Sequence, residues 1–140
     1  MRDFELQILT PERPFYEGRC ESITVPVSDG MLGIQAGHEA LTAAVMDGEV
    51  AFTLPSGERR LCSVSRGLLD VSAENVRLIC ESALAPEEID EERERRALEE
   101  ARLQLAERRS RRDYMMTQLA FARAVNNLKV KHHNAEKFIK

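Results

Sequence analysis

The chain has 140 residues, of which 43% are hydrophobic and 31% charged, enough for one well-packed domain with an appendage. Tryptophan is absent and aromatic residues make up only 5%, which predicts an aliphatic core. No stretch approaches the roughly 20 apolar residues of a membrane-spanning helix, and the amino-terminal residues lack the apolar run of a secretory signal. We therefore expect a soluble protein made in the cytoplasm, without direct insertion into a membrane.

Glycine and proline are confined to one part of the chain. All seven glycines and all five prolines lie at or before Pro86. Because these residues mark turns and interrupt helices, residues 1–86 are expected to form short strands and residues 87–140 an uninterrupted helical region. The fold class that follows is α+β, with the strands before the helices.

The first predicted strand alternates, with Phe4, Leu6 and Ile8 on one face. Further strands are expected at residues 15–16, 22–25, 48–54, 61–64, 68–71 and 76–80. Proline is expected to end the strand that reaches Pro26. About eight to ten short strands at this spacing predict a β-sandwich or flattened barrel.

Three cysteines, Cys20, Cys62 and Cys80, lie in these apolar stretches. They are odd in number and contain no Cys-x-x-Cys pair, so we interpret them as small buried strand residues of a protein in a reducing compartment. A disulfide or a metal site is the less favoured interpretation.

The helical region is expected to form an antiparallel two-helix hairpin. Residues 85–88, Ala-Pro-Glu-Glu, predict a helix start, because proline fits the first turn and carboxylates favour the positive end of the helix dipole. Residues 108–112 are too polar to bury and are expected at the hairpin tip. One apolar line on the second helix contains Met115, Leu119, Ala122 and Val125. This line is thin, so the hairpin is expected to depend on packing against another surface.

Charge is distributed unevenly along the chain. Residues 87–107 carry nine acidic and four basic side chains, whereas residues 108–140 carry nine basic and two acidic ones. This asymmetry predicts an acidic partner for the carboxyl-terminal segment. Nucleic acid is not expected, because the basic segment has few aromatic residues and no glycine-rich or zinc-ligand spacing. An acidic protein surface is favoured.

No catalytic residues are predicted. A metal enzyme on a small β-barrel needs clustered histidines, but the strand region offers only His38. His132 and His133 are adjacent, so both rings cannot face one metal from the same side of a helix. There is also no phosphate-binding Gly-x-x-x-x-Gly-Lys loop. The chain is therefore expected to act without chemistry of its own.

Residues 29–41 read Asp-Gly-Met-Leu-Gly-Ile-Gln-Ala-Gly-His-Glu-Ala-Leu. Closely spaced glycines permit positive backbone angles and close approach by a neighbouring chain. Leu32 and Ile34 would anchor such a loop to the sheet. Taken alone, this segment is more typical of an ordinary tight turn.

With the predicted domain order, this segment resembles the epsilon subunit of bacterial rotary ATP synthases, whose loop reads Gly-x-Leu-Gly-Ile-x-x-Gly-His. Further similarity covers residues 65–71, 89–90, 113–114 and 128–130, so the resemblance extends over essentially the whole chain. Ala36 stands where many relatives have proline. The resemblance implies a non-catalytic central-stalk subunit that couples the c-ring to the gamma subunit and the catalytic head. It also implies a peripheral position at the cytoplasmic face of the bacterial cell membrane.

The resemblance implies the following contact residues. The c-ring and the gamma subunit would meet the β-sandwich domain, residues 1–86, near Gly30, Met31, Leu32, Gly33, Ile34, Gly37 and His38. The hairpin, residues 87–140, would inhibit ATP hydrolysis by contacting the alpha and beta subunits of the catalytic head. We expect Arg123, Lys129 and Lys131 to make that contact.

Some relatives bind regulatory ATP through an Ile/Leu-Asp-x-x-Arg-Ala motif. Ile89, Asp90 and Arg93 match it, and Arg123 fits a supporting position, but Glu94 replaces the alanine. Because extra carboxylates repel a polyphosphate, tight ATP binding is not expected, and neither is a cofactor or a metal. The alternative function is a free-standing β-sandwich scaffold whose basic carboxyl-terminal helix binds RNA or an acidic protein.

Overall fold

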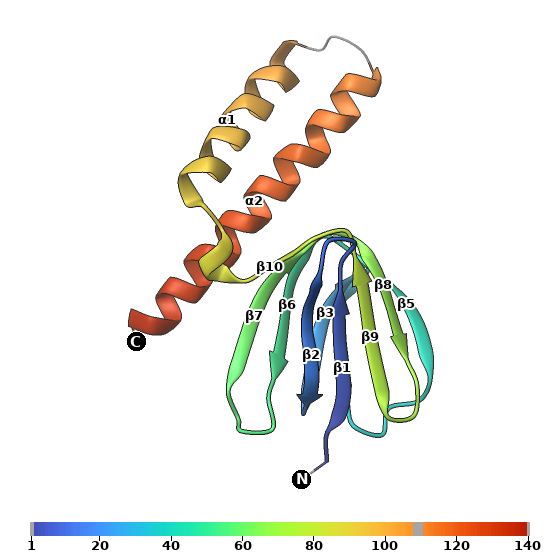
Figure 1. Cartoon of the computed structure of the whole chain (residues 1–140). Helices are drawn as coiled ribbons and strands as arrows, with labels where there is room; N and C mark the ends of the chain where they lie inside the picture. The colour runs from blue at the N-terminus through green and yellow to red at the C-terminus, as the bar shows by residue number, and fades with distance from the viewer. Residues whose placement is uncertain (1, 108–110, 140) are drawn as a thin grey trace. The chain divides into compact units, whose positions relative to one another are not determined.

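A computed structural model describes residues 2–107 and 111–139 (Figure 1). The chain divides into two compact units, Met1–Ala85 and Pro86–Lys140. The first unit is a β-sandwich of ten strands, and the second contains a short 3-10 helix and two long α-helices. This order confirms the expected α+β fold, in which a β-sandwich precedes a helical hairpin.

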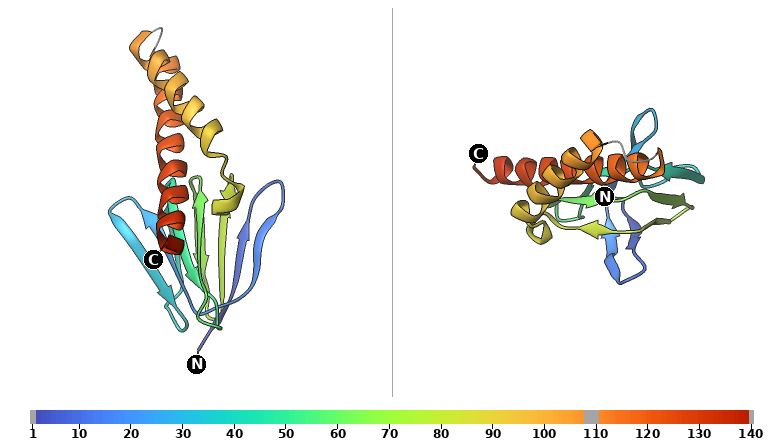
Figure 2. Two further views of the ribbon diagram at one scale, coloured as in Figure 1. Left: turned by 90° about the vertical axis from the view of Figure 1, so that its left-hand side faces the viewer. Right: turned by 90° about the horizontal axis from the view of Figure 1, so that it is seen from above.

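The sandwich consists of two five-stranded sheets, which form separate layers (Figure 2). Sheet A has the strand order β2-β1-β9-β8-β5, and sheet B has the order β10-β7-β6-β3-β4. The bounds are β1 (Phe4–Leu9), β2 (Pro14–Cys20), β3 (Ser22–Val27), β4 (Gly30–Gln35), β5 (Leu41–Val45), β6 (Gly48–Thr53), β7 (Arg59–Val64), β8 (Gly67–Val71), β9 (Asn75–Cys80) and β10 (Ala83–Leu84). Strands β1 and β9 are parallel, whereas the other paired neighbours are antiparallel.

The core between the sheets is mostly aliphatic, as expected, and includes all three cysteines. Burial raises the pKa of the Cys20 and Cys80 thiols to about 11, and it also raises the pKa of Cys62. The three thiols are free and buried, which confirms their interpretation as strand residues. Because the thiolate is the reactive form, none of them is poised as a nucleophile.

The prediction that Pro26 ends a strand was wrong. Strand β3 continues to Val27, and Pro26 pairs with Met31 of β4. Strand β6 pairs with β3 only along residues 22–24, so no β6 neighbour needs a backbone N–H from Pro26. Residues 30–35, expected as a loop, form β4 at the edge of sheet B.

The helical unit begins with a 3-10 turn at Pro86–Glu88, and α1 spans Glu91–Glu107. The predicted helix start at residues 85–88 was therefore too early. The Asp90 carboxylate accepts a hydrogen bond from the Arg93 N–H at 3.2 Å and caps α1, a role that aspartate fills well. Helix α2 spans Arg111–Ile139 and lies antiparallel beside α1 (Figures 1 and 2). None of the described helices is long and apolar enough to cross a membrane.

Within the described residues, the helical unit buries both apolar and polar side chains. Besides Pro86, these are Ile89, Ala101, Thr117, Ala124, Asn127 and Val130. The Thr117 hydroxyl donates to the Gln104 side-chain oxygen at 3.3 Å, joining the two helices. Ile89 and Val130 are the large apolar side chains among these buried residues.

Candidate functional site

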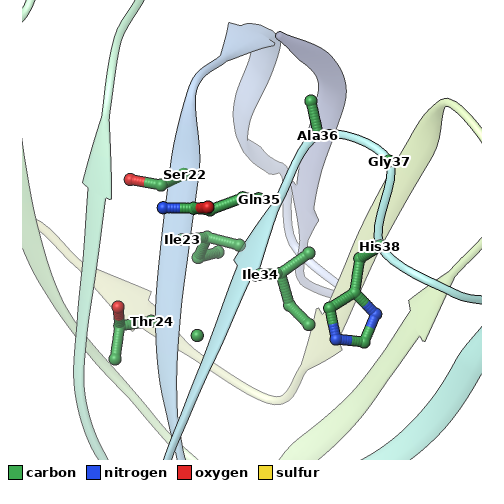
Figure 3. A pocket seen from close by; sticks show the side chains of 9 residues that line it. Ser22, Ile23, Thr24, Ile34, Gln35, Ala36, Gly37 and His38 are labelled. Carbon is green, nitrogen blue, oxygen red and sulfur yellow. The ribbon is translucent and has the colours of Figure 1, made fainter. Parts of the chain in front are cut away.

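The predicted contact segment consists of edge strand β4 and the turn after it. Within the described residues, β4 pairs only with β3, so its other edge is open. Side chains of Ser22, Thr24, Gln35 and His38 line an open hollow of about 420 Å³ in this region (Figure 3). The Met31 side chain is 59% exposed, whereas Ile34 is buried in the core. An exposed strand edge is a template for pairing with another chain, which suits a contact surface.

The turn from Gln35 to His38 explains why residue 37 is a glycine. The His38 N–H donates to the Gln35 carbonyl oxygen at 3.2 Å, and Gly37 between them has φ +83°. A positive φ at the third residue of a turn strongly favours glycine. The expectation of a positive backbone angle is correct for Gly30 and Gly37 but wrong for Gly33, which pairs with Thr24 in the β3–β4 ladder.

Gly37 and Gly33 are expected to respond differently to substitution by valine. Gly37→Val is expected to lower the free energy of unfolding by about 1–3 kcal/mol, because a β-branched residue is strained at positive φ. Gly33→Val is expected to change it by less than about 1 kcal/mol, since valine suits a strand. A Cβ atom at residue 33 would meet only the Thr24 hydroxyl, at 3.9 Å. Urea denaturation of both variants checks this, and equal destabilisation would contradict it.

A row of apolar side chains crosses the outer face of sheet A. The strand register places Leu9 of β1 beside Ile79 of β9, Ile79 beside Leu68 of β8, and Leu68 beside Ala44 of β5. Leu68 is 45% exposed and Ile79 46% exposed, and Ala44 is also exposed. We call these four residues the outer apolar row. Contiguous apolar surface of this kind marks an interaction site more often than a scattered single side chain does.

The next row on the same face is polar. Arg77 of β9 donates to the Gln7 side chain at 3.3 Å, and the Thr42 hydroxyl of β5 donates to Asp70 of β8 at 3.3 Å. Arg77 and Asp70 are themselves cross-strand neighbours. The face therefore changes from apolar to polar within one step along the strands, as an interface core changes into its rim.

Sequence reasoning missed the outer apolar row. Its signal was present as two apolar doublets, Leu68-Leu69 and Leu78-Ile79, because a strand with one solvated face alternates instead. One member of each doublet is buried in the core and the other lies on the outer face. Apolar doublets in neighbouring strands thus predict apolar side chains on both faces of a sheet.

The outer surface of α2 is also apolar near its beginning. Met115, Leu119 and Ala122, predicted as one line, are exposed instead of packed against α1, and Met116 beside them is 64% exposed. We call these four residues the α2 strip. The spacing i, i+4, i+7 places three of them on one helix face, the pattern by which an amphipathic helix docks in a groove.

The three predicted inhibitory cations have different surroundings. Arg123 and Lys129 are exposed on α2. Lys131 is half-buried, and its ammonium donates to the Pro86 carbonyl oxygen at 3.2 Å. Lys131 therefore has a contact inside the hairpin, whereas Arg123 and Lys129 present their charges to solvent.

Of the four residues that match the ATP-binding motif, two stabilise the hairpin and two are exposed. Ile89 is buried in the hairpin, Asp90 caps α1, and Arg93 and Arg123 are exposed. Within the described part of the chain, no three His, Cys, Asp or Glu side chains are grouped closely enough to hold a metal ion.

Both units match known protein families. Residues 3–86 match the β-sandwich domain of the ATP synthase delta/epsilon chain, and residues 87–131 match its long α-helix domain. The chain belongs to the ATP synthase delta/epsilon chain family.

Relatives across nearly the whole chain agree with this assignment. The ATP synthase epsilon chain of Caldicellulosiruptor saccharolyticus is 33% identical over 130 residues, 93% of this chain and 94% of the relative. That of Caldicellulosiruptor bescii is 32% identical over 136 residues, 97% of this chain and 98% of the relative. A chain in the structure of the Euglena gracilis mitochondrial ATP synthase, described as OSCP/F1/c-ring in rotational state 1, has the same fold. Its TM-score is 0.77 at 21% identity, with 95% of this chain and 81% of that chain covered.

Membership of the delta/epsilon family confirms the resemblance to the ATP synthase epsilon subunit that residues 29–41 and the domain order indicated. The chain is a subunit of ATP synthase and is not an enzyme by itself. As part of that complex it is associated with a membrane peripherally. The alternative of a free-standing scaffold is not favoured.

Proposed function

We propose that this chain is the central-stalk subunit that connects the c-ring to the gamma subunit. The observation that carries the proposal is the outer apolar row on sheet A. Leu9, Ile79 and Leu68 lie partly exposed on three neighbouring strands, and each gains about 1 kcal/mol when a partner covers its remaining surface. We assign this row to the gamma subunit, and we assign β4 and the turn after it to the c-ring.

Two matched structures support this assignment of partners. The Euglena gracilis structure is described as containing F1 and the c-ring. A chain in the Tetrahymena thermophila mitochondrial ATP synthase structure, described as central stalk/c-ring, has a TM-score of 0.53 at 18% identity and covers 62% of this chain and 69% of that chain. Because the matched epsilon chains of Caldicellulosiruptor saccharolyticus and Caldicellulosiruptor bescii are bacterial, we place the subunit at the cytoplasmic face of the bacterial cell membrane.

The second half of the proposal concerns the hairpin, which acts as a brake on ATP hydrolysis. The α2 strip supplies apolar contact to the alpha and beta subunits of the catalytic head, and Arg123 and Lys129 supply positive charge toward an acidic surface there. Aligned charge of this kind speeds and orients docking more than it tightens binding. The brake works without bound ATP, since Ile89 and Asp90 already pack and cap the hairpin.

Removing the hairpin tests the assignment of gamma binding to the sandwich. A fragment of residues 1–85 contains the whole buried core of the first unit and the outer apolar row. It is expected to bind purified gamma subunit within about threefold of the full chain, a difference below about 0.7 kcal/mol. Isothermal titration calorimetry with both proteins checks this. Loss of all affinity in a folded fragment would show that the hairpin carries gamma binding.

A further inference from the structure

Gly33 leaves a gap in the row of side chains on the outer face of β4. Met31 and Gln35, two positions away on either side, are exposed on this face, whereas Ile34 is buried in the core. The residue opposite Gly33 on β3 is Thr24. Gly33, Thr24 and Gln35 all line the open hollow of about 420 Å³, which we call the β4 hollow (Figure 3).

The fold itself does not require a glycine at residue 33. Its φ is not positive, unlike that of Gly30 and Gly37, and a Cβ atom there would meet only the Thr24 hydroxyl, at 3.9 Å. The β3–β4 register is unbroken along the whole of β4, so the glycine does not serve a bulge. A glycine inside a strand also marks a place where another backbone approaches closely, and the open space over Gly33 fits that role.

The lining of the β4 hollow offers hydrogen bonds without formal charge. The Ser22 and Thr24 hydroxyls and the Gln35 side-chain amide make no hydrogen bond to another residue in the described part of the chain. His38, at one end, donates from Nδ1 to the Glu39 carbonyl oxygen at 2.8 Å. Aspartate, glutamate, lysine and arginine are absent from the residues that line the hollow. A group that fits there supplies donors and acceptors and carries no charge.

We propose that the gap at Gly33 admits an uncharged main-chain segment of the c-ring, which hydrogen-bonds to Ser22, Thr24 and Gln35. A peptide group carries one donor and one acceptor without charge. It can lie against a strand only where no side chain holds it away. The Met31 side chain, 59% exposed on the same face, supplies apolar contact beside it. The choice of the c-ring rests on the proposed function, in which β4 and the turn after it face that partner.

This contact responds to side-chain size at residue 33 and not to ionic strength. A side chain at that position occupies the space of the c-ring segment, and overfilling a close contact weakens it by about 10- to 100-fold. Salt screens exposed charges, but the groups in the β4 hollow are neutral. The loss caused by a larger residue is therefore expected to be the same at low and at high salt.

The test uses the full chain assembled with the gamma subunit and the catalytic head, and c-rings in lipid vesicles as the probe. Sedimentation with the vesicles measures attachment. Gly33→Ala, Gly33→Val and Gly33→Leu are expected to weaken attachment progressively, by about 10- to 100-fold for leucine. Thr24→Val keeps the shape of the side chain but removes its hydroxyl, and it is expected to weaken attachment about three- to tenfold, whereas Thr24→Ser stays near the unaltered chain.

The matched control is Asn75→Val, which adds a β-branched side chain at an exposed strand position on the other sheet. It is expected to change attachment less than about twofold. Urea denaturation of each variant measures folding, and calorimetry with purified gamma subunit measures the other interface. Gly33→Leu is expected to leave gamma binding within about twofold of the unaltered chain.

The outcomes separate this proposal from the function on which it rests. Undiminished attachment by Gly33→Leu would overturn the proposal, and so would a loss that merely follows the fall in unfolding free energy. Weaker binding to gamma with unchanged attachment would overturn the choice of the c-ring as the occupant. If the unaltered chain supports no attachment at all, the proposed connection to the c-ring is itself wrong, and this contact with it.

Discussion

Leu68→Asp is expected to weaken binding of the gamma subunit at least about 100-fold, or about 2.7 kcal/mol. Leu68 lies in the middle of the outer apolar row, between Ile79 and Ala44. A partner that covers the row would enclose the new carboxylate among apolar groups, where a charge without a partner is strongly unfavourable. The free chain leaves residue 68 nearly half exposed, so its unfolding free energy is expected to fall by only about 1 kcal/mol.

The matched control is Asn75→Asp, which adds the same charge on an exposed position of the same sheet face, away from the outer apolar row. It is expected to change gamma binding less than about threefold. Calorimetry with purified gamma subunit measures both variants, and thermal unfolding verifies that each is folded. If Leu68→Asp binds like the control, the gamma subunit does not use this row.

Local patterns predicted the interior of the sandwich but not its edge. Phe4, Leu6 and Ile8 are buried as their alternation predicted, because burial of one strand face follows from the period of the side chains. Pro26 and residues 30–35 were misassigned, because the outcome depended on which strand lies alongside. At Pro26 no β6 neighbour requires an N–H, and at residues 30–35 pairing with β3 turns a glycine-rich segment into a strand.

The outer apolar row was harder to predict because its residues come from strands that are far apart in the sequence. Leu9 and Ile79 lie 70 positions apart and meet only because β1 and β9 pair in parallel. No local pattern contains that pairing. The α2 strip posed a related difficulty, since α2 carries several apolar positions at helical spacing. The sequence alone does not say which of them face α1, and the structure buries Ala124 and Val130 while leaving Met115 and Leu119 exposed.

The hairpin buries some of its apolar side chains and leaves others exposed on α2. The buried side chains of the helical unit include two alanines, a threonine and an asparagine beside Ile89 and Val130, whereas methionines and a leucine occupy the exposed α2 strip. Methionine is flexible and polarizable, so it adapts to surfaces of different shape. An apolar groove that covered the exposed α2 strip would therefore bury additional apolar area.

The double variant Met115→Asp, Leu119→Asp is therefore expected to weaken inhibition of ATP hydrolysis. The concentration of this subunit needed for the same inhibition is expected to rise about 100-fold, which corresponds to about 2.7 kcal/mol. Both side chains are exposed, so the closed hairpin loses little internal packing. The measurement is ATP hydrolysis by the reconstituted catalytic head and gamma subunit as the variant is titrated. Arg123→Ala with Lys129→Ala is expected to give a smaller loss that disappears at high salt, because solvent-exposed charges are screened.

Leu103→Asp provides the control for this last variant. Leu103 is 53% exposed on α1, so the substitution adds a carboxylate to the hairpin without touching α2. Inhibition by Leu103→Asp is expected to stay within about threefold of the unaltered chain. An equal loss from Leu103→Asp would mean that both helices enter the catalytic head together as a closed pair. Undiminished inhibition by the α2 double variant would instead assign the brake to the exposed cations, whose contribution the salt series measures directly.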